Sequence, residues 1–264
     1  MHGIFNLKKL NVQEKSKGVI LFAVNTDTVD YVKIAEQASR LIKHTLNLPT
    51  TIITDPGVPT ADNYRTGYAG GTRWKNGGRY RAYELSPYDE TILFDSDYLQ
   101  FDTSLLNILD TTIDYRLMHH NQSPTMSMSG NMGQVSLDYV WATAITFKRT
   151  DKTKALFDLV GRIERNYAYY RKLYQLRESN FRNDYAFAIA NNIISGYNTD
   201  LSQSIPFTML TLDKPVKNIE ITDEKMIIRE KNIAHVIAKQ NVHIMDKDYL
   251  LSADFDKLVD TICA

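Results

Sequence analysis

The sequence has a single cysteine among its 264 residues and no net charge. Because Cys263 has no partner for an internal disulfide, the composition fits a reducing compartment. The 31 Lys and Arg residues balance 31 Asp and Glu residues, so no global field attracts nucleic acid or an anionic membrane. No apolar stretch approaches the ~20 residues of a membrane span, and residues 1–17 lack the apolar core of a signal peptide. We therefore expect a cytoplasmic protein without a membrane partner.

The N-terminal part of the chain alternates strand and helix signals. Gly18–Val24 is a continuous apolar run, which is typical of a buried strand in a parallel sheet. Apolar residues then recur at helical spacing over Tyr31–Leu46, and Thr51–Thr54 has the composition of a second strand. A third apolar run, Thr91–Phe94, leads directly into Asp95. The pattern predicts an α/β fold with a mostly parallel central sheet flanked by helices.

The remainder of the chain adds elements but no boundary between domains. It has no repeats, no low-complexity tract and no clear linker, so the sequence predicts one domain spanning residues 1–264. Leu117–Gln134, which is rich in Met, Ser, Asn and Gly, is predicted to be a loop. The other expected elements are a strand at Tyr139–Phe147, helices at Asp151–Ser179, Asp184–Ile194 (with Asn183 as its cap) and Tyr249–Ile262, and two strands within Met226–Met245.

A glycine-rich, basic segment separates the second and third predicted strands. Residues 59–82 hold five glycines and five Lys or Arg residues, with Asp62 as the only acid, so the segment is predicted to be a mobile lid. Arg79 and Arg81 are candidates to clamp a diphosphate, because guanidinium groups bind phosphate oxygens bidentately. The alternative is an ordinary solvated basic loop, since surface arginines are common.

Two carboxylates follow the third predicted strand. Asp95 and Asp97 stand at a strand's carboxyl end, where ligands bind in open α/β sheets. Residues i and i+2 of an extended chain point the same way, so both carboxylates can share one Mn²⁺ or Mg²⁺. The spacing alone is weak, because it recurs at Asp246/Asp248 and at Asp254/Asp256, where surface acids are the ordinary explanation. The buried strand and basic loop before the first pair favour a metal that neutralises a leaving diphosphate.

Three short segments of the chain resemble one family of enzymes. Residues 87–98, PYDETILFDSDY, are similar to the stretch around the metal-binding Asp-x-Asp of nucleotide-sugar glycosyltransferases with the GT-A fold, especially the glycogenin and galactosyltransferase type. Residues 22–27, followed by Tyr31 and Ala35, resemble the family's first strand and nucleotide-binding helix. Residues 182–186 resemble its acidic segment facing the acceptor. Similar arrangements occur in uncharacterised transferase-like proteins of tailed phages. Asp-Ser-Asp departs mildly from the commoner Asp-Ala-Asp.

This resemblance implies a single-domain, GT-A-like Rossmann-type fold, with a nucleotide-binding half at about 18–100 and an acceptor half at about 101–264. It implies a metal-dependent glycosyltransferase that moves a sugar from a nucleoside-diphosphate sugar, by default a UDP-sugar, to a hydroxyl. On the donor side it implies contacts from Asn25, Thr26, Asp27, Tyr31, Ser96 and Lys247. Tyr31 either stacks on the base or simply packs within its helix.

The resemblance also implies a third metal ligand, a histidine near the C-terminus. His235 and His243 are both candidates, and each has a lysine four residues on, Lys239 or Lys247, that can reach a phosphate. The Pro-Trp that usually follows this lysine in the family is absent from both segments. We favour His243, because its segment leads into the last predicted helix. Asp184 is expected to act as general base or to bind the transferred sugar, unless it only stabilises a helix start.

Other interpretations stay open. A nucleotidyltransferase also uses strand-end carboxylates and a divalent metal, but it usually carries a Gly-rich phosphate loop where Asn25-Thr26-Asp27 stands. A degenerate transferase fold that serves as a binding module is a further alternative. The acceptor is a hydroxymethylated pyrimidine in DNA, a glycan, a protein or a small molecule. The DNA hypothesis rests on basic residues and tyrosines clustered within residues 162–182, a pattern that a solvated helix also explains.

Overall fold

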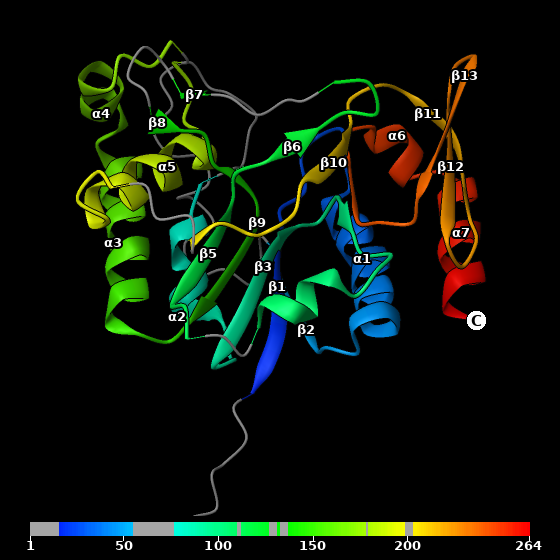
Figure 1. The fold of residues 1–264 in the computed structure, drawn as a ribbon, viewed down its shortest axis with the longest axis horizontal. Helices are drawn as coiled ribbons and strands as arrows, with labels where there is room; N and C mark the ends of the chain where they lie inside the picture. The colour runs from blue at the N-terminus through cyan, green and yellow to red at the C-terminus, as the bar shows by residue number, and fades with distance from the viewer. Residues whose placement is uncertain are drawn as a thin grey trace, which may run out of the picture.

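A five-stranded mixed sheet lies at the centre of the fold (Figure 1). The computed structural model describes residues 16–54, 77–109, 112–126, 131–132, 137–177, 179–198 and 203–264. The strands of the central sheet are β1 (Lys17–Ala23), β2 (Thr50–Thr54), β3 (Glu90–Asp95), β5 (Tyr115–Met118) and β9 (Trp141–Lys148). In the order β2-β1-β3-β9-β5, only β9 runs against the others. This arrangement confirms the predicted α/β class with a mostly parallel central sheet.

Helices cover both faces of this sheet. Because side chains alternate along a strand, Val19 and Leu21 enter one hydrophobic core while Ile20 enters the other. The first face is covered by α1 (Tyr31–Leu46), and α7 (Ala253–Cys263) packs against α1 (Figure 1). The second face is covered by α3 (Asp151–Arg165) and α5 (Asn183–Ile194).

The first helix shows how local sequence signals place the site. The Asp30 carboxylate caps α1 by accepting a hydrogen bond from Lys33 N at 3.0 Å. At the other end Asn47 takes a left-handed conformation with φ 51°, which ends the helix. The helix returns antiparallel to β1, so its first residue, Tyr31, lies at the carboxyl edge of the parallel strands. That edge is where ligands bind in such sheets.

A second, smaller sheet adjoins the end of β3. Its order is β4-β14-β10-β6, with β10 parallel to both of its neighbours and β4 antiparallel to β14. A three-stranded antiparallel meander connects β10 to β14. The bounds are β4 (Tyr98–Leu99), β6 (Asn121–Gln122), β10 (Met209–Leu212), β14 (Val242–Ile244) and, in the meander, β11 (Val216–Ile221), β12 (Lys225–Glu230) and β13 (Ile233–Ala238).

The remaining described elements are short. They are the 3-10 helices η2 (Arg79–Arg81) and η3 (Ser104–Ile108), the helices α2 (Ala82–Leu85), α4 (Tyr167–Leu173) and α6 (Lys247–Leu250), and the strand pair β7 (Asn131–Met132) and β8 (Leu137–Asp138). Among the described residues, no helix combines the length and the apolar character needed to cross a bilayer.

Several predicted elements need correction. The segment predicted as a loop, Leu117–Gln134, contains the end of β5 and the short strands β6 and β7. The predicted helix Asp151–Ser179 breaks at Asn166, whose side-chain amide donates to Arg162 O at 2.9 Å, so that α4 begins separately. Asn183 is the first residue of α5 rather than its cap, because Arg182 holds the cap position. The stretch from Met226 to Met245 holds parts of three strands instead of two.

Candidate metal centre

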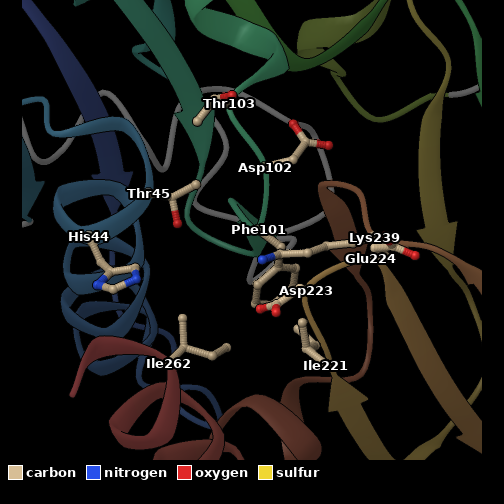
Figure 2. A pocket seen from close by; sticks show the side chains of 10 residues that line it. All are labelled: His44, Thr45, Phe101, Asp102, Thr103, Ile221, Asp223, Glu224, Lys239 and Ile262. Carbon is tan, nitrogen blue, oxygen red and sulfur yellow. The ribbon is translucent and has the colours of Figure 1, made fainter.

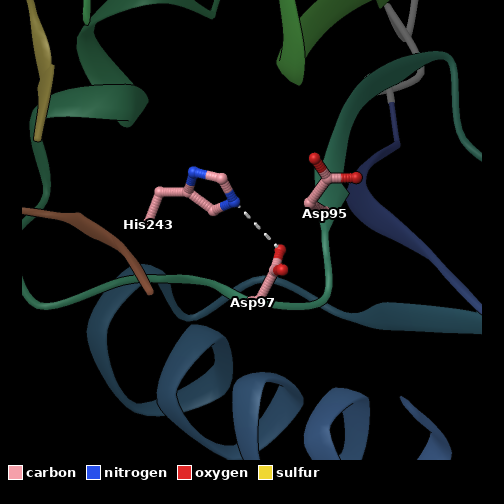
Figure 3. Close-up of side chains that lie close together, drawn as sticks. All are labelled: Asp95, Asp97 and His243. Atoms are coloured by element: carbon pink, nitrogen blue, oxygen red, sulfur yellow. Dashed lines mark ion pairs between the residues drawn. The ribbon is translucent and has the colours of Figure 1, made fainter. Parts of the chain in front are cut away.

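Three potential metal ligands lie together where β3 ends. Asp95 is the last residue of β3, and Asp97 immediately precedes β4. Because β4 pairs with β14, His243 lies opposite Tyr98, and Ile244 N donates to Asp97 O at 2.9 Å. One ligand atom from each of Asp95, Asp97 and His243 lies within 4.8 Å of the other two (Figure 3). Strand pairing therefore brings the C-terminal part of the chain to the carboxylate pair.

The Asp97 carboxylate lies between Lys247 and His243. Its side chain is 12% exposed, its Oδ2 accepts a hydrogen bond from Lys247 Nζ, and its Oδ1 lies 3.4 Å from His243 Nε2. Burial alone would raise the pKa of Asp97, but the ammonium charge of Lys247 and, after it, the neighbouring His243 outweigh burial and hold that pKa well below its usual range. Burial alone would lower the pKa of Lys247, but Asp97 outweighs that effect and raises it. Both side chains are therefore charged at neutral pH.

Asp95 is paired with a buried arginine. Arg79 Nη2 lies 2.5 Å from Asp95 Oδ1, and Arg79 is only 5% exposed. It is the first residue of η2, which follows Gly78 in a left-handed conformation with φ 79° that favours glycine. Gly78 N donates to both carboxylate oxygens of the buried Glu164, at 3.1 and 3.2 Å. This contact with α3 holds Arg79 beside the end of β3. Arg81, at the other end of η2, is half-buried.

The predicted nucleotide-side residues form the turn between β1 and α1. Asn25 Oδ1 accepts from Val32 N at 2.9 Å, and Thr26 Oγ1 accepts from Val29 N at 3.0 Å. These two side chains shape the entry to α1, whereas Asp27 is exposed. Burial raises the pKa of the Tyr31 hydroxyl. The charge of Lys247 lowers this pKa, and the charges of Asp97 and Asp95 raise it. Tyr31 therefore lies near the charges of the candidate site, and the buried Ser96 lies between the two carboxylates in the chain.

Asp184 is held at the same edge of the central sheet. Phe94 of β3 is opposite Ala144 of β9, and Ala142 lies two residues further toward that edge. Asp184 Oδ1 accepts from Ala142 N at 2.9 Å, while Oδ2 accepts from Arg182 Nε at 3.1 Å. The Asp184 side chain is 15% exposed. Its helix, α5, begins one residue earlier, so Asp184 also occupies the first turn, where the helix dipole favours a negative charge.

The structure does not bring His235 to the carboxylates. His235 lies on β13 in the meander, where its Nε2 is 3.3 Å from Oε2 of the buried Glu230 on β12. The register of β12 with β13 places the two side chains near each other and away from β14. Residues 59–76 of the predicted lid, with Arg65, Arg73 and Lys75, lie outside the described residues, whereas its last residues, 77–82, include η2 and the first residue of α2.

A separate open pocket of about 470 Å³ lies at the other end of α1 (Figure 2). Its lining includes His44 from α1, Asp102 from the segment after β4, Glu224 from the β11–β12 turn and Lys239 after β13. The 16 residues of α1, about 24 Å at 1.5 Å per residue, separate this pocket from Tyr31. The pocket is therefore not part of the candidate metal centre.

Sequence reasoning missed the residues behind His243. Thr211 Oγ1 lies 3.3 Å from His243 Nδ1 and 2.8 Å from Asn121 Oδ1, and Thr211 and Asn121 are fully buried. Glu164, which anchors η2, was also missed. The one available signal for Thr211 was its hydroxyl within the otherwise apolar run Met209–Leu212.

Comparisons with known proteins give fold-level likenesses only. No protein-family model and no curated protein matches the sequence. The structure resembles the apo-form glycosyltransferase GlyE of Streptococcus pneumoniae TIGR4, with 13% identity and a TM-score of 0.36 over 68% of this chain and 43% of that chain. It also resembles the galactosyltransferase LgtC in complex with donor and acceptor sugar analogs, with 11% identity and a TM-score of 0.41 over 66% and 70%.

A third similar structure is the inositol-1-phosphate CTP transferase of T. maritima, with 9% identity and a TM-score of 0.33 over 94% of this chain and 96% of that chain. The chain spans less than half the length of the GlyE structure that it matches. Likeness at these levels of identity and TM-score does not carry over an activity.

Proposed function

We propose that this chain is a glycosyltransferase that moves a sugar from a nucleoside-diphosphate sugar, a UDP-sugar, to a hydroxyl acceptor, with Mn²⁺ bound at the end of β3. The observation that carries the proposal is the convergence of Asp95, Asp97 and His243, flanked by Arg79 and Lys247. A metal and two cations around one strand end form a site for a diphosphate.

The donor set fits a divalent cation. Ligand atoms around an octahedral ion with bonds of about 2.1 Å lie roughly 3.0 to 4.2 Å apart. The atoms of Asp95, Asp97 and His243 lie within 4.8 Å of one another, so binding would require a closure of at most about 0.6 Å for an opposite pair and about 1.8 Å for an adjacent pair, which side-chain rotation can supply. Two carboxylates and one imidazole favour Mn²⁺ over Mg²⁺, because Mg²⁺ prefers oxygen ligands throughout.

The charge of the site also fits the proposed donor. The two carboxylates balance the charges of Arg79 and Lys247, so that these four groups sum to zero. A divalent cation would leave a double positive charge, which equals the double negative charge of a nucleoside-diphosphate sugar. A nucleoside triphosphate, the donor of a nucleotidyltransferase, carries more negative charge than this site would neutralise. This balance favours sugar transfer over nucleotidyl transfer.

Each polar group can be given a role. The bound cation would neutralise charge on the leaving diphosphate. Arg79 and Lys247 stand beside the carboxylates, where their charged groups can bind phosphate oxygens. Tyr31, at the start of α1, lies within reach of the nucleotide side. Both Asp184 oxygens already accept hydrogen bonds, which fixes the side chain and favours binding of a sugar hydroxyl over proton abstraction.

A donor screen tests this proposal directly. The protein would be incubated with Mn²⁺ and individual nucleotide sugars, and hydrolysis would be followed by mass spectrometry; binding of Mn²⁺ and donor would be measured by calorimetry. Asp95→Asn with Asp97→Asn should abolish Mn²⁺-dependent donor binding, and circular dichroism would check the fold of this variant, because it leaves Lys247 and the buried Arg79 without their carboxylate partners. Asp254→Asn is a matched control, because this exposed acid belongs to another Asp-x-Asp. Unchanged Mn²⁺ and donor affinity in the double variant would refute the proposed site.

The acceptor is proposed to be a polyanion, and a hydroxymethylated pyrimidine in DNA is the candidate. Four exposed cations lie along α3, α4 and the residues after them, and none forms an ion pair with another described residue. Tyr169 and Tyr197 in the same region are 63% and 60% exposed. Basic side chains bind phosphates and tyrosines stack on bases. The four cations are Arg162, Arg165, Lys172 and Arg177.

Duplexes with and without hydroxymethylated pyrimidines would test this acceptor. The protein, Mn²⁺ and a mixture of nucleotide sugars would be incubated with each duplex, which is then digested to nucleosides and weighed by mass spectrometry. A mass gain on the hydroxymethylated nucleoside alone supports DNA as the acceptor. No mass gain, together with no salt-sensitive binding to duplex, would exclude DNA as the acceptor without contradicting the sugar-transfer proposal.

A further inference from the structure

A fully buried polar pair lies behind His243 in the second sheet. Asn121 on β6, Thr211 on β10 and His243 on β14 come from three neighbouring strands. Thr211 is directly opposite His243, and Asn121 is opposite Met209, two residues before Thr211. Asn121 and Thr211 are both 0% exposed, and the other residues of β10 are buried apolar residues. A buried hydroxyl costs stability unless it is hydrogen-bonded, so the partners of Thr211 matter.

The direction of the hydrogen bonds follows from what each atom can do. Thr211 Oγ1 donates its only hydrogen to Asn121 Oδ1, a carbonyl oxygen that can only accept, at 2.8 Å. The Thr211 oxygen then has only lone pairs left for His243 Nδ1, which lies 3.3 Å away. Nδ1 must therefore carry a hydrogen and donate it. The other ring nitrogen, Nε2, lies 3.4 Å from Asp97 Oδ1, on the side of the two carboxylates where a cation would bind.

We propose that Thr211 and Asn121 are positioning residues that hold the hydrogen of His243 on Nδ1 and present Nε2 to the divalent cation. The inference rests on the proposed metal site and adds to it the two groups that orient its nitrogen ligand. Asn121 acts through Thr211: without the amide oxygen, the hydroxyl can rotate and donate to Nδ1. His243 would then carry its hydrogen on Nε2, where it cannot bind a metal.

Substitutions separate this role from simple packing. Thr211→Val keeps the shape and removes the acceptor for Nδ1–H, whereas Thr211→Ser keeps the hydroxyl. Asn121→Leu leaves Thr211 in place but frees its hydrogen. Thr91→Val is the matched control, because Thr91 is also a fully buried strand threonine, and its hydroxyl bonds Ser86 Oγ at 2.6 Å instead of a ligand.

Two measurements on the full chain test the proposal. Calorimetry with Mn²⁺ should show 10- to 100-fold weaker binding for Thr211→Val and for Asn121→Leu, the usual effect of losing a group that orients a ligand, and unchanged binding for Thr211→Ser and Thr91→Val. Nitrogen-15 NMR of the histidine rings, with and without Mg²⁺, should show a hydrogen on Nδ1 of His243 in the wild type and in Thr211→Ser.

The possible outcomes are distinct. A folded Thr211→Val variant that binds Mn²⁺ as tightly as the wild type would overturn the inference, as would a wild-type ring without hydrogen on Nδ1, a result that does not depend on any variant folding. If the wild type keeps its Nδ1 hydrogen but binds no Mn²⁺, the proposed metal site fails and the hydrogen-bond chain from Asn121 to His243 stands on its own.

Discussion

Replacing Lys247 by methionine should destabilise the metal-free protein by about 3 kcal/mol, the low end of the 3–5 kcal/mol for breaking a buried ion pair. The side chains of Lys247 and Asp97 are 19% and 12% exposed, so solvent cannot take over the charge of the remaining carboxylate. The low end applies because His243 Nε2 still faces Asp97 at 3.4 Å. For a chain of this length, that loss corresponds to a melting temperature lower by roughly 6–12 °C.

Manganese should reverse much of this loss. In the wild type the Asp97 carboxylate is shared with an ammonium group, whereas in Lys247→Met it is free for the cation. The gain in stability with added Mn²⁺, which follows RT ln(1 + [L]/Kd), should therefore be larger in the variant than in the wild type. The assay is thermal and urea unfolding in EDTA and in Mn²⁺ at neutral pH.

A double variant and a surface control complete the experiment. Lys247→Met with Asp97→Asn should recover most of the lost stability, because no buried charge is then left unpaired. Lys257→Met should change nothing measurable, since Lys257 and Asp254 are 77% and 68% exposed. If Lys247→Met costs less than about 1 kcal/mol, the value typical of surface pairs, the two side chains are not a buried pair and the reasoning fails.

Three further predictions follow from single contacts. Gly161→Ala should destabilise the protein by about 1 kcal/mol, because the added Cβ would meet Tyr80 Cδ2 at 2.7 Å. This clash outweighs the ~1 kcal/mol by which alanine is favoured over glycine in a helix. An unchanged urea midpoint would contradict the prediction. Arg79→Met should weaken donor binding by ~1.5–3 kcal/mol, and calorimetry showing wild-type affinity would exclude a phosphate contact. Burial lowers the pKa of His119, although a hydrogen bond with Tyr139 O opposes this shift. Because the unfolded chain then binds the proton more readily than the folded protein, stability should fall as the pH drops below about 6.5. His119→Gln should reduce this fall, measured as the urea midpoint between pH 7.5 and 5.5, and an equally steep fall in the variant would refute the prediction.

Local patterns predicted the first half of the fold well. The bounds of α1 agree with the predicted Tyr31–Leu46, because an apolar stripe, a capping aspartate and a left-handed Asn47 all act within a few residues. The strand that ends at Asp95 was also predicted correctly, because a strand buried on both faces has a continuous run of apolar residues.

Most of the second sheet was not predicted from the sequence. Its strands are two to four residues long, and paired residues are 32 to 145 positions apart in the sequence, with the largest separation between β4 and β14. Such pairing leaves no local periodicity to detect. The choice between His235 and His243 depended on it, and so did the contact between Thr211 and Asn121, which no spacing rule relates. Asn166 broke the predicted long helix through a single competing side-chain hydrogen bond.

The pairing of β4 with β14 has a consequence for how the chain opens. Only two residue pairs, Val242 with Leu99 and His243 with Tyr98, join these strands, and the proposed cation would lie across that seam. An ion shared by Asp97 and His243 would therefore act as a reversible cross-link between two parts of the chain that are far apart in sequence. By thermodynamic reciprocity, a change that favours local unfolding of β14 and the helices after it also lowers the affinity for the ion. Binding of the ion, in turn, stabilises the packing of the C-terminal part of the chain against the end of β3.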